Sequence, residues 1–109
     1  MANGHPSTNI KLEQLLQTAQ QALQNNNDKY ATRCLDEALR LDARNAQANY
    51  LAGIIAFQHG MTQKGIKSLT KALKSDACNP GIHNTLGSML LSAKKLQEAQ
   101  KHFKKAIAS

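Results

Sequence analysis

A self-alignment of the chain at an offset of 34 residues brings similar residue types into register. Gly53 and Gly87 are one such pair. The other registered series are Ala38, Ala72 and Ala106; Ala31, Gly65 and Ala99; and Leu35, Leu69 and Phe103. A period of this length with small residues at fixed places is typical of stacked helix–turn–helix units. The repeat predicts a short solenoid, a fold that functions through the surface it presents.

The composition favours helices throughout. The 109 residues include no Val, only two Pro and 4% aromatic residues, and segments rich in Ala, Leu, Gln and Lys have high helix propensity. We therefore predict an all-α domain of about six helices, preceded by a flexible leader at 1–8. The expected helices are 9–24, a second that follows Asp28 and fades at 42–45, 46–59, a fourth that follows Thr62 and ends near Ser75, a fifth that starts near Pro80, and 96–108. The expected capping residues are Asn9, Asp28 and Thr62.

The small residues of the repeat have a mechanical explanation. Two helices approach to about 8–9 Å only where the side chains at the crossing are small. Ala19, Gly53 and Gly87 are expected where the first helix of each unit meets the second. The residues expected to face them are Ala31, Gly65 and Ala99.

Two segments of the chain carry a recognisable spacing of small and apolar residues. Residues 46–60 have the register A-x6-G-x6-G, and residues 86–106 have L-G-x2-L…L-x-E-A-x3-F-x2-A. In these registers the chain resembles tetratricopeptide repeats. The first unit departs from the family pattern, with Thr18 and Ala19 where Leu-Gly is usual. The resemblance implies a right-handed α–α superhelix, or solenoid, of antiparallel helices. Its single domain would span 9–109, with repeats at 12–45, 46–79 and 80–109.

In such a superhelix the first helix of each unit lines the concave face. By period, we expect this face to combine an apolar centre with an amide rim and almost no charge. Such a surface suits an extended peptide or a partner helix. Core packing between neighbouring helices is the competing interpretation for Tyr50, Ile54 and Phe57. The expected concave residues are Leu16, Gln20, Leu23, Gln24, Tyr50, Ile54, Phe57, Gln58, Asn84, Ser88 and Leu91.

The predicted function is therefore a non-catalytic module that binds a protein or peptide partner in a concave groove. The alternative is an N-terminal recruiting segment of a larger enzyme, because 46–109 also resembles repeats found ahead of the catalytic domains of glycosyltransferases and sulfotransferases. Related domains that grip the C-terminal carboxylates of chaperones use a clamp of Lys, Asn and Arg. The corresponding positions lack a cation that could pair with a carboxylate; they hold Leu16, Gln20, Leu51, Gly81 and Thr85.

The net charge of +7 is concentrated in the C-terminal part of the chain. Lys64, Lys67, Lys71 and Lys74 recur at helical spacing. A solvated convex face explains them better than a surface for phosphates, since no aromatic residues alternate with them for base stacking. Nucleic acid is accordingly not an expected partner.

Other classes of function find little support in the sequence. The four His and two Cys are widely spaced, so no catalytic, metal or cofactor site is predicted. His83 is expected to pack rather than to bind metal. The first ten residues lack an apolar run and no segment could span a bilayer, which favours a cytoplasmic location without membrane association. The last helix repeats the apolar pattern without a following helix, which predicts a homodimer through the C-terminal helix.

Overall fold

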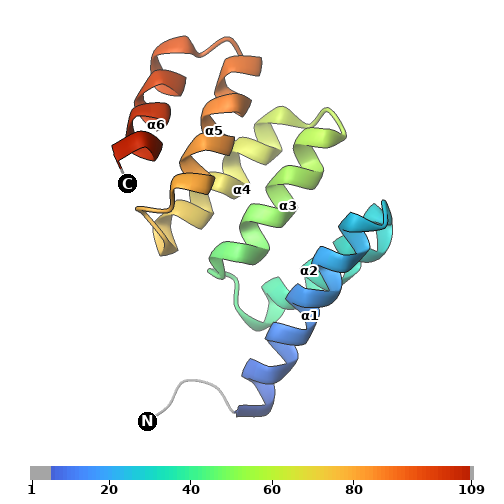
Figure 1. Ribbon diagram of the computed structural model, residues 1–109. Helices are drawn as coiled ribbons and strands as arrows, with labels where there is room; N and C mark the ends of the chain where they lie inside the picture. The colour runs from blue at the N-terminus through green and yellow to red at the C-terminus, as the bar shows by residue number, and fades with distance from the viewer. Residues whose placement is uncertain (1–5, 109) are drawn as a thin grey trace.

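The computed structural model describes residues 6–108, which form six helices and no strand. The helices follow one another as three antiparallel hairpins (Figure 1), and the expectation of an all-α solenoid is confirmed. Their bounds are α1 Pro6–Gln24, α2 Asp28–Leu41, α3 Ala46–Gln58, α4 Thr62–Ser75, α5 Pro80–Ser92 and α6 Leu96–Ala108.

The first helix begins earlier than the sequence predicted. It starts at Pro6 rather than near Asn9, because Pro is well suited to the first turn, where its missing N–H needs no partner. The three residues 6–8 are thus helical, and the rest of the leader expected at 1–8 lies outside the described residues.

Asparagine side chains cap three of the helices. Asn27 Oδ1 accepts the N–H of Tyr30 at 3.3 Å, Asn45 Oδ1 that of Ala48 at 2.8 Å, and Asn79 Oδ1 that of Ile82 at 3.1 Å. The expected caps Asp28 and Thr62 are both wrong. Asp28 is the first residue of α2, one position after its cap, and Thr62 is the first residue of α4, whose cap position, Met61, makes no side-chain hydrogen bond.

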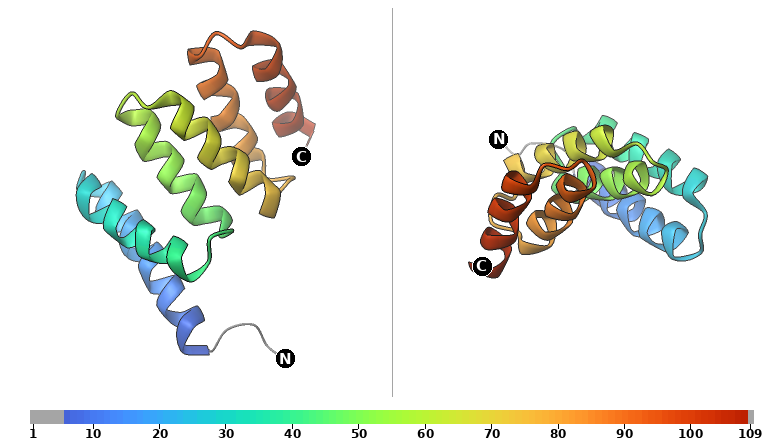
Figure 2. Two further views of the ribbon diagram at one scale, coloured as in Figure 1. Left: turned by 180° about the vertical axis from the view of Figure 1, so that it is seen from behind. Right: turned by 90° about the horizontal axis from the view of Figure 1, so that it is seen from above.

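The first helices of the hairpins share one side of the molecule. In Figure 1, α1, α3 and α5 lie in front of α2 and α4, and Figure 2 shows α2 and α4 in front when the molecule is seen from behind. This arrangement places α1, α3 and α5 on one face, as the repeat pattern predicted.

Glycine allows the closest approach between α3 and α4. A Cβ added at Gly53 would collide with Leu69 Cδ1 and lie 3.1 Å from the Gly65 carbonyl oxygen. A Cβ added at Gly65 would lie 3.0 Å from the Gly53 carbonyl oxygen. The two glycines therefore face each other across this crossing. At the equivalent crossing of α5 and α6, a Cβ on Gly87 would lie 2.7 Å from the Phe103 ring.

The core consists of two hydrophobic clusters. One gathers buried residues of α1, α2 and α3, including Leu16, Leu35 and Leu51. The other gathers buried residues of α4, α5 and α6, including Leu69 and Met89. The half-buried Tyr50 packs against both, and its hydroxyl lies 3.1 Å from the Thr85 hydroxyl. Tyr50 thus connects the second hairpin to the third.

Candidate binding surface

The face made by α1, α3 and α5 has little charge. Neither Ala46–Gln58 nor Pro80–Ser92 contains Lys, Arg, Asp or Glu. By contrast, α4 alone carries four lysines. A ligand on the α3–α5 face would therefore be recognised by shape, apolar contact and hydrogen bonds rather than by ion pairs.

The residues predicted for the concave face differ in their exposure. Leu16 is buried in the core, so it cannot contact a ligand in this conformation. Leu23, Tyr50, Ile54 and Phe57 are half-buried. Tyr50 and Phe57 also pack against the core clusters, in line with the alternative of packing between helices. The exposed members of the set are Gln20, Gln24, Gln58, Asn84, Ser88 and Leu91.

One hollow of about 540 Å³ brings two of the predicted residues, Gln20 and Tyr50, together. It lies where the N-terminal ends of α3 and α5 meet α1. The loops that precede those two helices supply lining residues that the sequence reasoning missed; they are Asn45, Asp76 and Asn79. Asn45 and Asn79 use their oxygens as helix caps, and Asn79 Nδ2 donates to Asp76 Oδ2 at 2.8 Å.

The side chains of this hollow are thus partly held in place before any ligand arrives. The exposed amides of Gln20 and Gln47 add donors and acceptors at its rim. An extended peptide has both N–H and C=O groups to satisfy, and side-chain amides supply both partners. The Asp76 carboxylate is the acidic member of this lining, a feature that favours a ligand with a basic or N–H-rich end.

The positions of the carboxylate clamp carry no cation in this structure. Leu16 and Leu51 are buried, and Thr85 is engaged with Tyr50. Gln20 and Gly81 are exposed and uncharged. The surface therefore lacks the groups that would pair with a peptide carboxylate.

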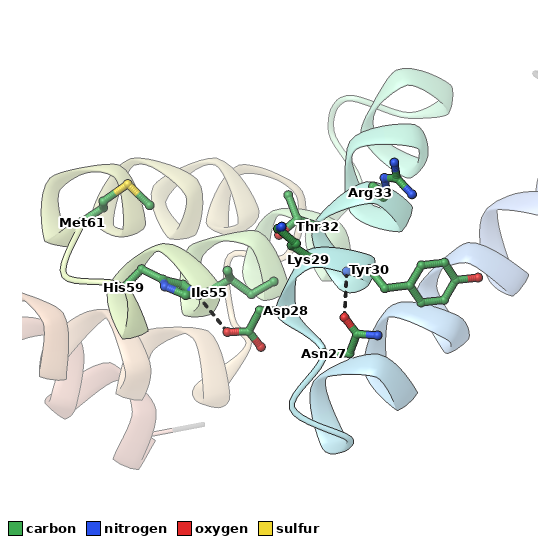
Figure 3. Close-up of a pocket in the computed structure, with 9 residues that line it drawn as sticks. All are labelled: Asn27, Asp28, Lys29, Tyr30, Thr32, Arg33, Ile55, His59 and Met61. Atoms are coloured by element: carbon green, nitrogen blue, oxygen red, sulfur yellow. Dashed lines mark hydrogen bonds and ion pairs between the residues drawn. The ribbon is translucent and has the colours of Figure 1, made fainter.

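A second hollow, of about 790 Å³, lies at the edge of the molecule between the start of α2 and the end of α3. Figure 3 shows His59 and Asp28 facing each other there, with the Tyr30 ring turned away from the pair. His59 Nε2 lies 2.9 Å from Asp28 Oδ2. This contact links the first two hairpins. Because both side chains are substantially exposed, it contributes little to the stability of the fold.

The lysines of α4 line a third hollow, of about 710 Å³, on the reverse face. Lys64, Lys67, Lys71 and Lys74 share it with Ile66 and Thr70. Like charges three or four residues apart on a helix repel each other by a few tenths of a kcal/mol. The stripe is consistent with a hydrated convex face.

Two histidines form a pair between α5 and α6. The Nδ1 atoms of His83 and His102 are 2.8 Å apart, and their rings are stacked with centroids 5.1 Å apart. His83 is buried, and its Nε2 donates to the Ala77 carbonyl oxygen at 2.7 Å. The expectation that His83 packs agrees with this arrangement. Burial, the neighbouring His83 and nearby Lys105 lower the pKa of His102 from its usual value of 6.5.

This geometry permits one proton between the two facing nitrogens. Because a carbonyl only accepts, His83 Nε2 carries a hydrogen, and neutral His83 therefore presents an unprotonated Nδ1 to His102. The His102 Nδ1–H then donates to it. If both rings were charged, two N–H groups would point at each other across 2.8 Å. The pair thus links α5 to α6 through a single N–H···N hydrogen bond.

The fold is that of a known class of helical-repeat solenoids. Residues 80–109 match the family model described as tetratricopeptide repeat. Residues 80–109 are thus similar in sequence to a tetratricopeptide repeat, and the chain as a whole has the fold of solved tetratricopeptide-repeat structures. No curated protein sequence matches it. None of the helices formed by residues 6–108 is long and apolar enough to cross a membrane.

Solved structures with the same fold come from proteins of different sizes. The chain is 24% identical to Pseudomonas aeruginosa pilF, with a TM-score of 0.85 over 92% of this chain and 45% of that one. It is 18% identical to a Thermobaculum terrenum O-GlcNAc transferase, with a TM-score of 0.90 over 99% of this chain and 20% of the transferase. The chain thus spans less than half the length of either protein.

A third similar structure has nearly the same extent as this chain. The second tetratricopeptide-repeat domain of Spaghetti (RPAP3), bound to an HSP90 peptide, is 15% identical, with a TM-score of 0.86. The match covers 95% of this chain and 98% of that domain. At these identities the structural comparisons establish the shared fold.

Proposed function

We propose that this protein is an interaction module whose concave face, made by α1, α3 and α5, binds an extended peptide segment of a protein partner. The observation that carries the proposal is the absence of charged residues from α3 and α5, combined with exposed amides and partly exposed aromatic rings. Amides can satisfy a peptide backbone, and aromatic rings supply apolar contact area.

The bound segment should be largely uncharged, with at most a basic group near the hollow that contains Asp76. A charged segment would lose hydration on this face without gaining an opposite charge in return. The Spaghetti domain provides a precedent for the fold, because it was solved with a peptide bound. Its acidic peptide, SRMEEVD, is not the ligand that we propose here, because the clamp positions of this chain hold no cation.

The proposal can be tested by selecting ligands from a phage-displayed peptide library on the purified protein. The affinity of a selected peptide would then be measured by calorimetry for Asn84→Arg and Ser88→Arg, which place a long charged side chain at exposed positions of α5. We expect each variant to bind at least about tenfold more weakly, a loss of about 1.4 kcal/mol. Gln63→Arg is the matched control, since it adds the same side chain at an exposed position of α4.

Equal affinities for the parent and both α5 variants would place the peptide elsewhere and reject the concave groove. An equal loss in the Gln63→Arg control would show that added positive charge, rather than position, weakens binding. Thermal melts of all three variants would verify that each remains folded.

We also propose, as a second candidate, that the chain acts as a recruiting segment within a larger enzyme. The long structural match to a small part of the O-GlcNAc transferase favours it. An antibody raised against residues 80–109 would measure the size of the native protein in cell extracts. A band much heavier than 11.9 kDa would support this candidate, and a band at that mass would reject it.

A further inference from the structure

The second helices of the first two hairpins differ in their balance of charge. α2 holds three basic and three acidic residues, whereas α4 holds four lysines and no acid. Lys71 takes the place that Glu37 has one unit earlier, and Glu37 forms an ion pair with Lys11 at 3.0 Å. The excess of positive charge is therefore a property of α4 itself and not of the repeat pattern.

The four lysines of α4 lie on one side of the helix. We call Lys64, Lys67, Lys71 and Lys74 the lysine stripe; all four are exposed, and they line one hollow of about 710 Å³. Their spacing of three, four and three residues spreads them over about 15 Å of the helix axis. None of them forms an ion pair with a described residue. Water hydrates the ammonium groups in the free protein, but their mutual repulsion stays uncompensated.

The rest of this hollow offers apolar contact and few hydrogen-bond donors. Ile66 lines it and is half-buried. Thr70 Oγ1 donates to the Ile66 carbonyl oxygen at 2.7 Å, so the hydroxyl proton is already used within α4. The donors left for a ligand are the ammonium groups and the Gln63 amide. Ammonium groups form their strongest hydrogen bonds with anionic oxygens, which selects an anionic ligand.

Two common polyanions fit the lysine stripe less well than an acidic polypeptide does. Single-stranded nucleic acid is bound by basic grooves that also stack its bases on aromatic rings, and α4 contains no aromatic residue. Helices that lie on anionic membranes also insert large apolar side chains, and no residue of Thr62–Ser75 is an exposed large hydrophobic residue. The carboxylates of an acidic segment need neither stacking nor insertion.

We infer that the lysine stripe binds an acidic segment of a protein partner. Glu or Asp side chains of that segment pair with the ammonium groups, and an apolar residue between them contacts Ile66. Charge is thus the basis of recognition here, in contrast to the uncharged face of α3 and α5. The stripe lies on the reverse side of the molecule, so its occupation leaves the proposed concave groove open (Figure 2).

The test uses two labelled peptides as probes. The acidic probe consists of four repeats of Glu-Glu-Leu-Ser, and its uncharged counterpart has Gln in place of every Glu. Binding of each probe to the full chain would be measured by fluorescence anisotropy at low salt. We expect the acidic probe to bind at least about tenfold more tightly than the uncharged one, and the difference to shrink as salt screens the charges.

A pair of double variants locates the binding. Lys67→Gln with Lys74→Gln removes two charges from the lysine stripe, and Arg33→Gln with Arg40→Gln removes two from the equivalent positions of α2. All four side chains are exposed, so both proteins should keep the fold, which thermal melts would verify. We expect the α4 variant to weaken the acidic probe at least about tenfold and the α2 variant less than about threefold.

Three results would overturn the inference. The first is equal affinity of the acidic and uncharged probes. The second is an equal loss in the two double variants, because net charge rather than the lysine stripe would then attract the probe. The third is tighter binding of an oligothymidylate or of phosphatidylserine vesicles than of the acidic probe, lost in the α4 variant, which would assign the stripe to phosphate groups.

Discussion

Asn49 and His83 occupy equivalent positions one repeat apart, and each donates a side-chain N–H to the carbonyl of an alanine in the loop that precedes its helix. Asn49 Nδ2 lies 3.1 Å from the Ala43 oxygen, and His83 Nε2 lies 2.7 Å from the Ala77 oxygen. Both side chains are buried. Two chemically different side chains thus bind equivalent backbone carbonyls. Each stabilises the turn that precedes the first helix of its unit.

This equivalence predicts how the two sites respond to substitution. Asn49→Leu leaves the Ala43 carbonyl without its donor, and we expect it to lower the free energy of unfolding by about 1–3 kcal/mol. His83→Asn should cost less than His83→Leu, because an amide at this position can reproduce the loop hydrogen bond. Urea unfolding of the three variants and the parent would measure the differences. Equal losses for His83→Asn and His83→Leu would contradict the shared role.

The helix crossings predict a ranked pair of overpacked variants. Gly53→Leu should lower the free energy of unfolding by roughly 3 kcal/mol or more, because its side chain would collide with the fully buried Leu69 and approach the backbone of Gly65. Gly87→Leu should cost less, since the Phe103 ring that it meets is partly exposed and can move. Thermal melts would establish the order, and a Gly53→Leu protein as stable as the parent would disprove the assigned register.

The histidine pair predicts a loss of stability in mild acid. The pKa of folded His102 lies below 6.5, so the unfolded chain binds more protons as the pH falls through that value. The contribution of His102 to the free energy of unfolding is therefore complete above pH 6.5. It is lost as the pH falls toward the lowered pKa. Melting temperatures at pH 7.5 and 5.5 should differ less for His102→Asn than for the parent. A larger pH dependence in His102→Asn than in the parent would contradict a lowered pKa of His102.

The proposed concave groove predicts which side chains matter for a selected peptide. Phe57→Ala should weaken binding by about 2 kcal/mol, because large aromatic contacts dominate interface energies. Lys67→Ala, on the opposite face, should change the affinity little. Calorimetry on both variants would compare them, with thermal melts as a control, since Phe57 also packs against the core. A larger loss for Lys67→Ala would move the binding surface to α4.

The number and order of the helices could be predicted from the sequence because the 34-residue period repeats the same packing contacts. The caps were harder to predict. Asp28 has the right chemistry, but Asn27 lies one position earlier and takes the role. A shift of one residue at a helix end depends on the local loop geometry, which the repeat pattern does not contain.

The candidate site was only partly predictable for a different reason. Helical period alone places Leu16 on the concave face, yet packing of α1 against its neighbours buries it. The hollow beside Gln20 needs Asn45, Asp76 and Asn79 from two loops, and their proximity depends on how the hairpins stack. Likewise, the contact of His83 with His102 depends on the pairing of α5 with α6.

The division of the core into two clusters, with Tyr50 packed against both, has a mechanical consequence for the solenoid. The α3–α4 hairpin belongs to both clusters, and the close approach of Gly53 to Gly65 holds its two helices together. A peptide that reaches from α1 to α5 would contact both clusters at once. We expect such a ligand to slow hydrogen exchange in both halves together, including helices that it never touches.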